Sequence, residues 1–174
     1  MTGRWMASVG ALLVLAGCPT EKEVTWVVDA DAHTASIRLH DLRTHDDLDE
    51  DWLVAGSMLR GIEGDGVTSD GIVRYEQVGD ALDVILDLEL DDATIDRLLP
   101  RSDQARIVCL PDPVLETNGV DLTELIGARC VAFGPATHVY TWTTVGDATD
   151  DEPSLLAAWR AAGAPAQVAV EPPR

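Results

Sequence analysis

Three histidines near the N-terminus are the residues best suited to chemistry. His33, His40 and His45 share one short stretch of the chain with several carboxylates. Those carboxylates are Asp29, Asp31, Asp41 and Asp46. Imidazole together with carboxylate suits Zn²⁺ or Mn²⁺, so a metal site is one hypothesis. The spacing matches no known ligand signature. We therefore interpret the three histidines as exposed structural residues and predict no bound metal.

Two acidic clusters, at 46–51 and 147–152, could supply oxygen ligands to calcium. Neither contains the Asp-x-Asp-x-Asp-Gly pattern of a calcium loop. Both precede predicted helices, where carboxylates are already favoured by the positive end of the helix dipole. A calcium-stabilised structural domain therefore stays an alternative rather than the leading interpretation.

The chain contains no GxSxG, HExxH, CxxC or Walker-type sequence. The pair Gly64 and Gly66 lacks the third glycine of a dinucleotide loop and follows a predicted helix rather than a strand. Ser57 lies on a helix expected to pack into the core. We predict no cofactor, and the sequence nominates no catalytic residue. A metal- or carboxylate-dependent hydrolase of the periplasm stays an alternative, and a pocket joining one of the three histidines to two carboxylates would favour it.

The N-terminus carries an apolar run of eleven residues, 6–16, preceded by Arg4. A helix needs about 20 apolar residues to span a bilayer, so this run is too short. It fits the apolar part of a secretory signal peptide.

The run ends in Leu15-Ala16-Gly17-Cys18. This sequence resembles the lipobox of bacterial lipoproteins, which reads Leu, small, small, Cys. The resemblance implies that residues 1–17 are removed as a signal peptide and that Cys18 is acylated. Acyl chains on Cys18 would hold the protein at a membrane of the cell envelope. The resemblance favours the outer membrane mildly, because Pro19 is not the Asp that marks inner-membrane retention in some bacteria.

Two further cysteines, Cys109 and Cys130, are separated by residues 110–129. Two thiols in an exported protein favour a disulfide, worth about 3 kcal/mol by loop-closure arithmetic. Both lie in or beside predicted strands, which could bring them to bridging distance. Two buried, reduced cysteines are the alternative.

Composition limits the possible partners. The 174 residues include 31 Asp and Glu against 12 Lys and Arg, and the formal net charge is −19. Such a charge argues against binding a nucleic-acid backbone, which requires clustered basic residues. Hydrophobic residues make up 46% of the chain, which is enough for a globular core.

Hydrophobic periodicity predicts the secondary structure. The predicted strands are a hairpin over 23–42, then 72–78, 82–90, 107–110, 129–133 and 137–144, the last two forming a hairpin around Gly134-Pro135. The predicted helices span about 47–60, 92–99 and 153–162. This order predicts an α+β fold, a mostly antiparallel sheet of hairpins with two or three short helices packed on one face. We expect a tether at 18–23, one globular domain at 24–163 and a flexible tail at 164–174.

The segment 82–90 has the clearest pattern in the chain, because its apolar and acidic residues alternate. Its apolar residues should face the core, and Asp83, Asp87 and Glu89 should face water, with Ile85 as the odd member. The tryptophans at 26, 52, 142 and 159 are interpreted as core residues rather than as a surface patch for a partner.

These observations lead to one functional expectation. We expect a membrane-anchored envelope lipoprotein that is not an enzyme and acts as a protein-interaction or structural module. Its expected partners are the membrane, through Cys18, and another protein.

Overall fold

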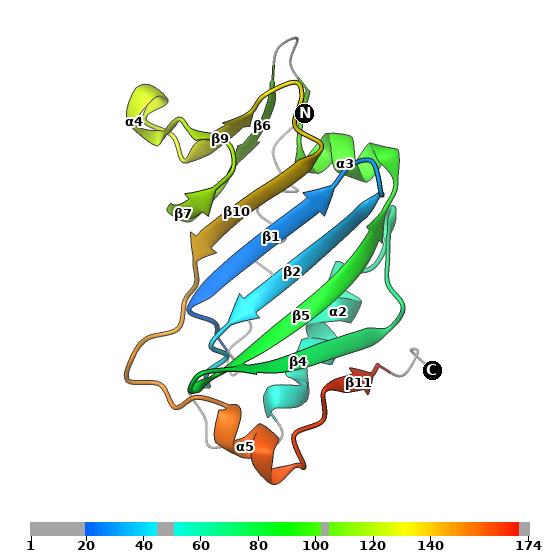
Figure 1. Cartoon of the computed structure of the whole chain (residues 1–174), viewed down its shortest axis with the longest axis vertical. Coiled ribbons are helices and arrows are strands. Elements are labelled where there is room, and N and C mark those ends of the chain that lie inside the picture. The colour runs from blue at the N-terminus through cyan, green and yellow to red at the C-terminus, as the bar shows by residue number, and fades with distance from the viewer. Residues whose placement is uncertain (1–19, 45–50, 102–104, 171–174) are drawn as a thin grey trace.

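The computed structural model describes residues 20–44, 51–101 and 105–170 (Figure 1). The predicted signal peptide, Cys18 and His45 lie outside these residues. No helix within the described part is long and apolar enough to cross a membrane.

The largest element of the described chain is one antiparallel sheet of eight strands. The strands are β1 (Glu23–Asp29), β2 (Thr34–His40), β3 (Val67–Thr68), β4 (Ile72–Val78), β5 (Ala81–Leu90), β7 (Val114–Thr117), β10 (Val139–Val145) and β11 (Gln167–Ala169). Their order across the sheet is β11-β4-β5-β2-β1-β10-β7, and β3 pairs with the end of β5. The predicted first hairpin is confirmed, because β1 and β2 pair along their whole length.

A smaller sheet contains β6 (Arg106–Cys109), β9 (Cys130–Phe133) and β8 (Val120–Asp121). The predicted hairpin between 129–133 and 137–144 is wrong. The chain passes from the small sheet to the large one at Gly134-Pro135, so β9 pairs with β6 and β10 pairs with β1. Phe133 then packs edge-on against Tyr140, with ring centres 5.1 Å apart. Strands from two sheets that pack on one core also alternate between buried and exposed residues. The apolar alternation in these two segments is therefore compatible with either arrangement.

The helices are short. They are the 3₁₀ helix η1 (Asp51–Val54), α2 (Ala55–Ile62), α3 (Asp92–Leu98), α4 (Thr123–Ile126) and α5 (Leu156–Ala161). Asp91 caps α3 by accepting a hydrogen bond from the Thr94 amide at 2.7 Å. The structure is thus a mostly antiparallel sheet with a few short helices, which agrees in outline with the α+β prediction.

The core lies against one face of the large sheet. Alternate residues of β1, β2, β4 and β5 point to this face and pack with Trp52, Leu59 and Trp159 from the helical segments. Figure 1 shows α2 behind the sheet and the opposite face of β1, β2 and β5 uncovered. The predicted core role of the tryptophans is confirmed for Trp52, Trp142 and Trp159, and the partly buried Trp26 stacks on Trp142.

Two predicted boundaries differ from the structure. Thr20 and Lys22, expected in a free tether, hydrogen-bond through their backbones to Arg43 and His40. The expected flexible tail contains β11, which pairs with β4, and Val170 donates its amide to the Gly71 carbonyl. Both segments belong to the folded domain, because their backbone groups form hydrogen bonds with adjacent strands and loops.

The packing of β5 predicts that shortening a side chain on its core face lowers stability much more than shortening one on its uncovered face. Leu86 is 1% exposed in the core, whereas Ile85 points to the uncovered face and is partly exposed. We expect Leu86→Ala to lower the free energy of unfolding by about 2–5 kcal/mol and Ile85→Ala to lower it by about 1 kcal/mol. Urea denaturation of both variants measures the difference, and equal losses would contradict the assigned faces.

Candidate functional site

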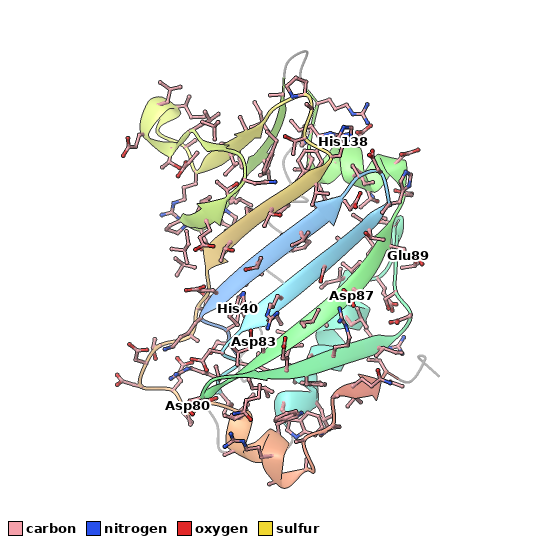
Figure 2. The ribbon with its side chains drawn as sticks, viewed as in Figure 1. His40, Asp80, Asp83, Asp87, Glu89 and His138 are labelled. Carbon is pink, nitrogen blue, oxygen red and sulfur yellow. A yellow bond between two sulfur atoms is a disulfide. The ribbon has the colours of Figure 1, made fainter. Side chains whose placement is uncertain are left out.

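The uncovered face of the large sheet, here called the open face, carries the polar side chains that the strands direct away from the core. One row crosses five strands in register: Thr143, Thr25, Arg38, Ile85 and Arg74. Cross-strand neighbours on one face lie about 5 Å apart, so these side chains are direct neighbours across the sheet. Figure 2 shows His40, Asp83, Asp87 and Glu89 on the same face.

Asp83 is the centre of a hydrogen-bonded network on the open face. Its Oδ2 accepts from Arg38 Nε at 2.8 Å and from His40 Nδ1 at 3.0 Å. Its Oδ1 accepts from the Asp41 amide at 3.1 Å. The prediction that Asp83 faces water is therefore wrong, since its side chain is only 3% exposed beneath Arg38 and His40. The prediction holds for Glu89, which is exposed, and Asp87 forms a surface ion pair with Arg74.

The three donors decide the charge of this carboxyl. Burial alone would raise the pKa of Asp83, because desolvation disfavours the charged form. The hydrogen bonds from His40, Arg38 and the Asp41 amide outweigh burial and hold the pKa of Asp83 below its ordinary value. The side chain is therefore a buried carboxylate that stays ionised at neutral pH.

His40 continues the network toward β1. Its Nε2 lies 2.9 Å from Thr25 Oγ1, which lies 2.8 Å from Thr143 Oγ1. A carboxylate only accepts, so Nδ1 donates to Asp83 and Nε2 of the neutral ring is an acceptor. Thr25 then donates to His40, and Thr143 donates to Thr25. The result is a chain of hydrogen bonds from hydroxyl through imidazole to carboxylate, in which each group donates to the next.

A shallow depression of about 500 Å³ opens beside this series. Its wall includes Thr25, Ser36 and Arg38 on β1 and β2, together with Arg74 and Ile85 on β4 and β5. It is open to solvent. A second shallow depression of about 350 Å³ adjoins it and shares Val27 and Ser36.

The histidines considered for a metal site have different surroundings, and His40, interpreted from the sequence as exposed, is half-buried against Asp83. His33 lies 3.5 Å from Asp92 in an exposed pair, whereas His40 belongs to the Asp83 network. His45 lies outside the described residues. Among the described residues, no group of three His, Cys, Asp or Glu side chains is arranged to hold a metal ion.

The acidic clusters considered for calcium have other contacts. Most of 46–51 lies outside the described residues. In 147–152, Asp150 pairs with Lys22. Glu152 is buried and accepts from Thr20 Oγ1 at 2.6 Å and from Thr149 Oγ1 at 3.0 Å. These acids attach the start of the described chain to the loop after β10.

Glu21 is a second buried carboxyl in that region. Gly146 packs directly on its backbone, and a Cβ at position 146 would lie 2.0 Å from the Glu21 carbonyl oxygen. Burial, together with the negative charges of Asp147 and Asp112, raises the pKa of Glu21 to about 7. The folded protein therefore binds a proton there that the unfolded chain releases at lower pH.

Cys109 and Cys130 form the predicted disulfide, and they are directly paired on β6 and β9. The bridge closes residues 110–129 into a projection, here called the stapled lobe, which contains β7, β8 and α4. Four aliphatic side chains of this lobe are exposed: Leu115, Val120, Leu125 and Ile126. Leu125 is 80% exposed. Figure 1 shows the lobe at the opposite end of the molecule from α5.

Comparison with known proteins finds no relative of this chain. No protein-family model, no curated protein and no solved structure matches the chain.

Sequence reasoning missed Thr25, Arg38 and Asp83 as one cluster. Thr25 and Arg38 lie on the polar side of the predicted first hairpin, so their facing positions followed from its register. The position of β5 beside β2 is a long-range pairing that local pattern does not contain, and this pairing brings Asp83 to His40.

The buried and exposed acids of β5 provide a matched pair of variants. We expect Asp83→Asn to lower the free energy of unfolding by about 2–4 kcal/mol, because it leaves Arg38 without its buried partner. Asp87→Asn should cost less than about 0.5 kcal/mol, because its ion pair with Arg74 is exposed to solvent. Guanidinium denaturation at pH 7 compares the two, and a cost for Asp87→Asn equal to that for Asp83→Asn would contradict the assignment.

The raised pKa of Glu21 predicts how stability depends on pH. A carboxyl with a raised pKa in the folded state stabilises the fold below the unfolded value, 4.5, and this stability is lost as pH rises to about 7. Glu21→Gln should therefore be more stable than the wild type at pH 8 by about 3 kcal/mol and nearly equal to it at pH 4. Thermal melts across this range measure the difference, and a constant difference at all pH values would show that Glu21 does not titrate in this way.

Proposed function

We propose that this protein is an envelope lipoprotein, anchored through Cys18, whose stapled lobe docks onto another envelope protein. The exposed aliphatic surface of the lobe is the observation that carries the proposal. Leu125 and Ile126 are adjacent in the chain and both exposed, and exposed apolar surface of this kind often marks an interaction site.

The disulfide supports the export part of the proposal. Disulfides persist in oxidising compartments such as the bacterial periplasm and are rare in the cytosol. The Cys109–Cys130 bridge agrees with the secretory signal that the lipobox resemblance implies. It also reduces the freedom of the lobe, so less conformational entropy is lost when the exposed side chains are bound.

The charges of the lobe favour a protein partner over lipid. Residues 110–129 contain four acids and one base, Arg129. The acids are Asp112, Glu116, Asp121 and Glu124. Anionic lipid would repel such a surface. A partner with an apolar pocket and a basic rim would complement Leu125 and Ile126 together with the surrounding carboxylates.

The anchor has a direct test. Mass spectrometry of the protein extracted from membranes of its native host should show an acylated N-terminal Cys18. Cys18→Ala should leave an unprocessed or soluble form, because the acylated residue is gone. An intact, unmodified Met1 in the native host would exclude lipidation.

The docking surface is tested in living cells by photo-crosslinking. A photo-reactive amino acid at Glu124 should give one adduct of defined mass, and the added substitution Leu125→Asp should reduce that adduct at least tenfold. The same photo-reactive group at Asp80, on the exposed β4–β5 turn, is the control and should give no such adduct. Equal adducts at both positions, or an adduct unaffected by Leu125→Asp, would refute docking through the lobe.

A further inference from the structure

The series Thr25, His40 and Asp83 has the arrangement of an activated nucleophile. A hydroxyl lies within hydrogen-bonding distance of an imidazole, and the other nitrogen of the ring is held by a carboxylate. This is the geometry by which enzymes activate Ser, Thr or Cys for covalent catalysis. We propose that the open face is an esterase site in which Thr25 is the nucleophile, His40 the general base and Asp83 a positioning residue.

Asp83 is held more firmly than a surface carboxylate. Arg38 and the Asp41 amide donate to it in addition to His40, and its side chain is almost fully buried. The carboxylate therefore keeps one orientation and keeps His40 in the tautomer that has a free lone pair on Nε2. Without that tautomer, His40 could not take a proton from Thr25.

Thr143 completes the positioning of the nucleophile. Its buried hydroxyl lies 2.8 Å from Thr25 Oγ1 and, in the direction derived above, donates to it. The Thr25 proton is then directed to His40, and one oxygen lone pair is left toward the depression, of which Thr25 forms part of the wall.

The same depression contains groups that could stabilise an oxyanion. Arg38 uses Nε for Asp83 and Nη2 for Glu76, and its Nη1 has no hydrogen-bond partner within the described residues. Arg74 lines the depression from β4. Guanidinium groups beside the nucleophile favour the negative charge that develops on a carbonyl oxygen. Val27 and Ile85 form an apolar part of the wall, suited to the acyl chain of a carboxylic ester.

The reaction balances without a cofactor. Thr25 Oγ1 attacks the ester carbonyl while His40 Nε2 takes the hydroxyl proton. The carbon–oxygen bond to the alcohol breaks, and His40 gives the proton to the leaving alkoxide, leaving an acyl group on Thr25. Water then attacks this acyl-threonine with His40 again as base. The carboxylic acid leaves, and the Thr25 hydroxyl regains its proton.

This inference is independent of the stapled lobe and of the anchor. His40 is hydrogen-bonded to Asp83, and Arg38 joins Asp83 to Glu76, which lines the depression.

The experiment uses the full chain purified in a nonionic detergent. The probes are p-nitrophenyl butyrate for turnover and an alkyl fluorophosphonate for covalent labelling, followed by peptide mass spectrometry. We expect a phosphonyl adduct on Thr25 and ester hydrolysis that Thr25→Val and His40→Gln each reduce by about 10²–10⁴-fold. Thr25→Ser should keep labelling. Thr141→Val, which changes another outward-facing threonine on β10, is the matched control and should keep both activities.

Asp83→Asn needs a readout beyond activity, because it is also expected to lower stability. The ¹⁵N chemical shifts of His40 distinguish the two imidazole tautomers, and they should change in Asp83→Asn at a temperature where the variant is folded. Circular dichroism melts confirm folding of each variant.

Two outcomes would overturn the proposal. One is hydrolysis or labelling that Thr25→Val leaves intact, because exposed imidazoles alone hydrolyse activated esters and the adduct would then lie elsewhere. The other is the absence of any adduct on Thr25 in wild-type protein whose melting curve is cooperative.

Discussion

Strand β5, which lies between β2 and β4 in the sheet, must bury its apolar side in the core, and this constraint decides what the open face displays. Five of its residues, Leu82, Val84, Leu86, Leu88 and Leu90, are buried in the core. Since side chains alternate along a strand, a shift of one residue would expose all of them. The register that avoids this also places Asp83 beside Arg38 and His40, so the polar network follows from the packing of the opposite face.

The buried carboxylate of Asp83 in turn organises the open face. A desolvated charge is costly unless donors surround it, and three donors from β2 and the residue after it surround Asp83. Arg38 and His40 are thereby held in place, and His40 extends this order to Thr25 and Thr143 on two further strands. One carboxylate on β5 thus aligns polar groups on three other strands, β2, β1 and β10. The face is a preorganised polar surface rather than a set of independently solvated side chains.

Local pattern was sufficient for the parts of the fold that neighbouring residues determine. The alternation in 82–90 and the hairpin at 23–42 follow from period two and turn residues, and the structure contains both. The disulfide followed from two cysteines beside predicted strands. The hairpin at Gly134-Pro135 failed because alternation shows which face of a strand is buried and not which sheet it joins. Asp83 was misassigned for a related reason, since its donors come from a strand more than forty residues earlier in the chain. Glu21 was placed in a tether because nothing local indicates that the loop after β10 covers it.

The ionisation of Asp83 is the most direct test of this account. Carboxyl ¹³C NMR of the folded protein, followed through an acid titration, measures the pKa of that one side chain. We expect Asp83 to titrate below the ordinary Asp value of 3.8, or to stay ionised until the protein unfolds. A pKa for Asp83 above that value would contradict it, because burial would then outweigh the donors, and the carboxylate could not hold Arg38 and His40 in place.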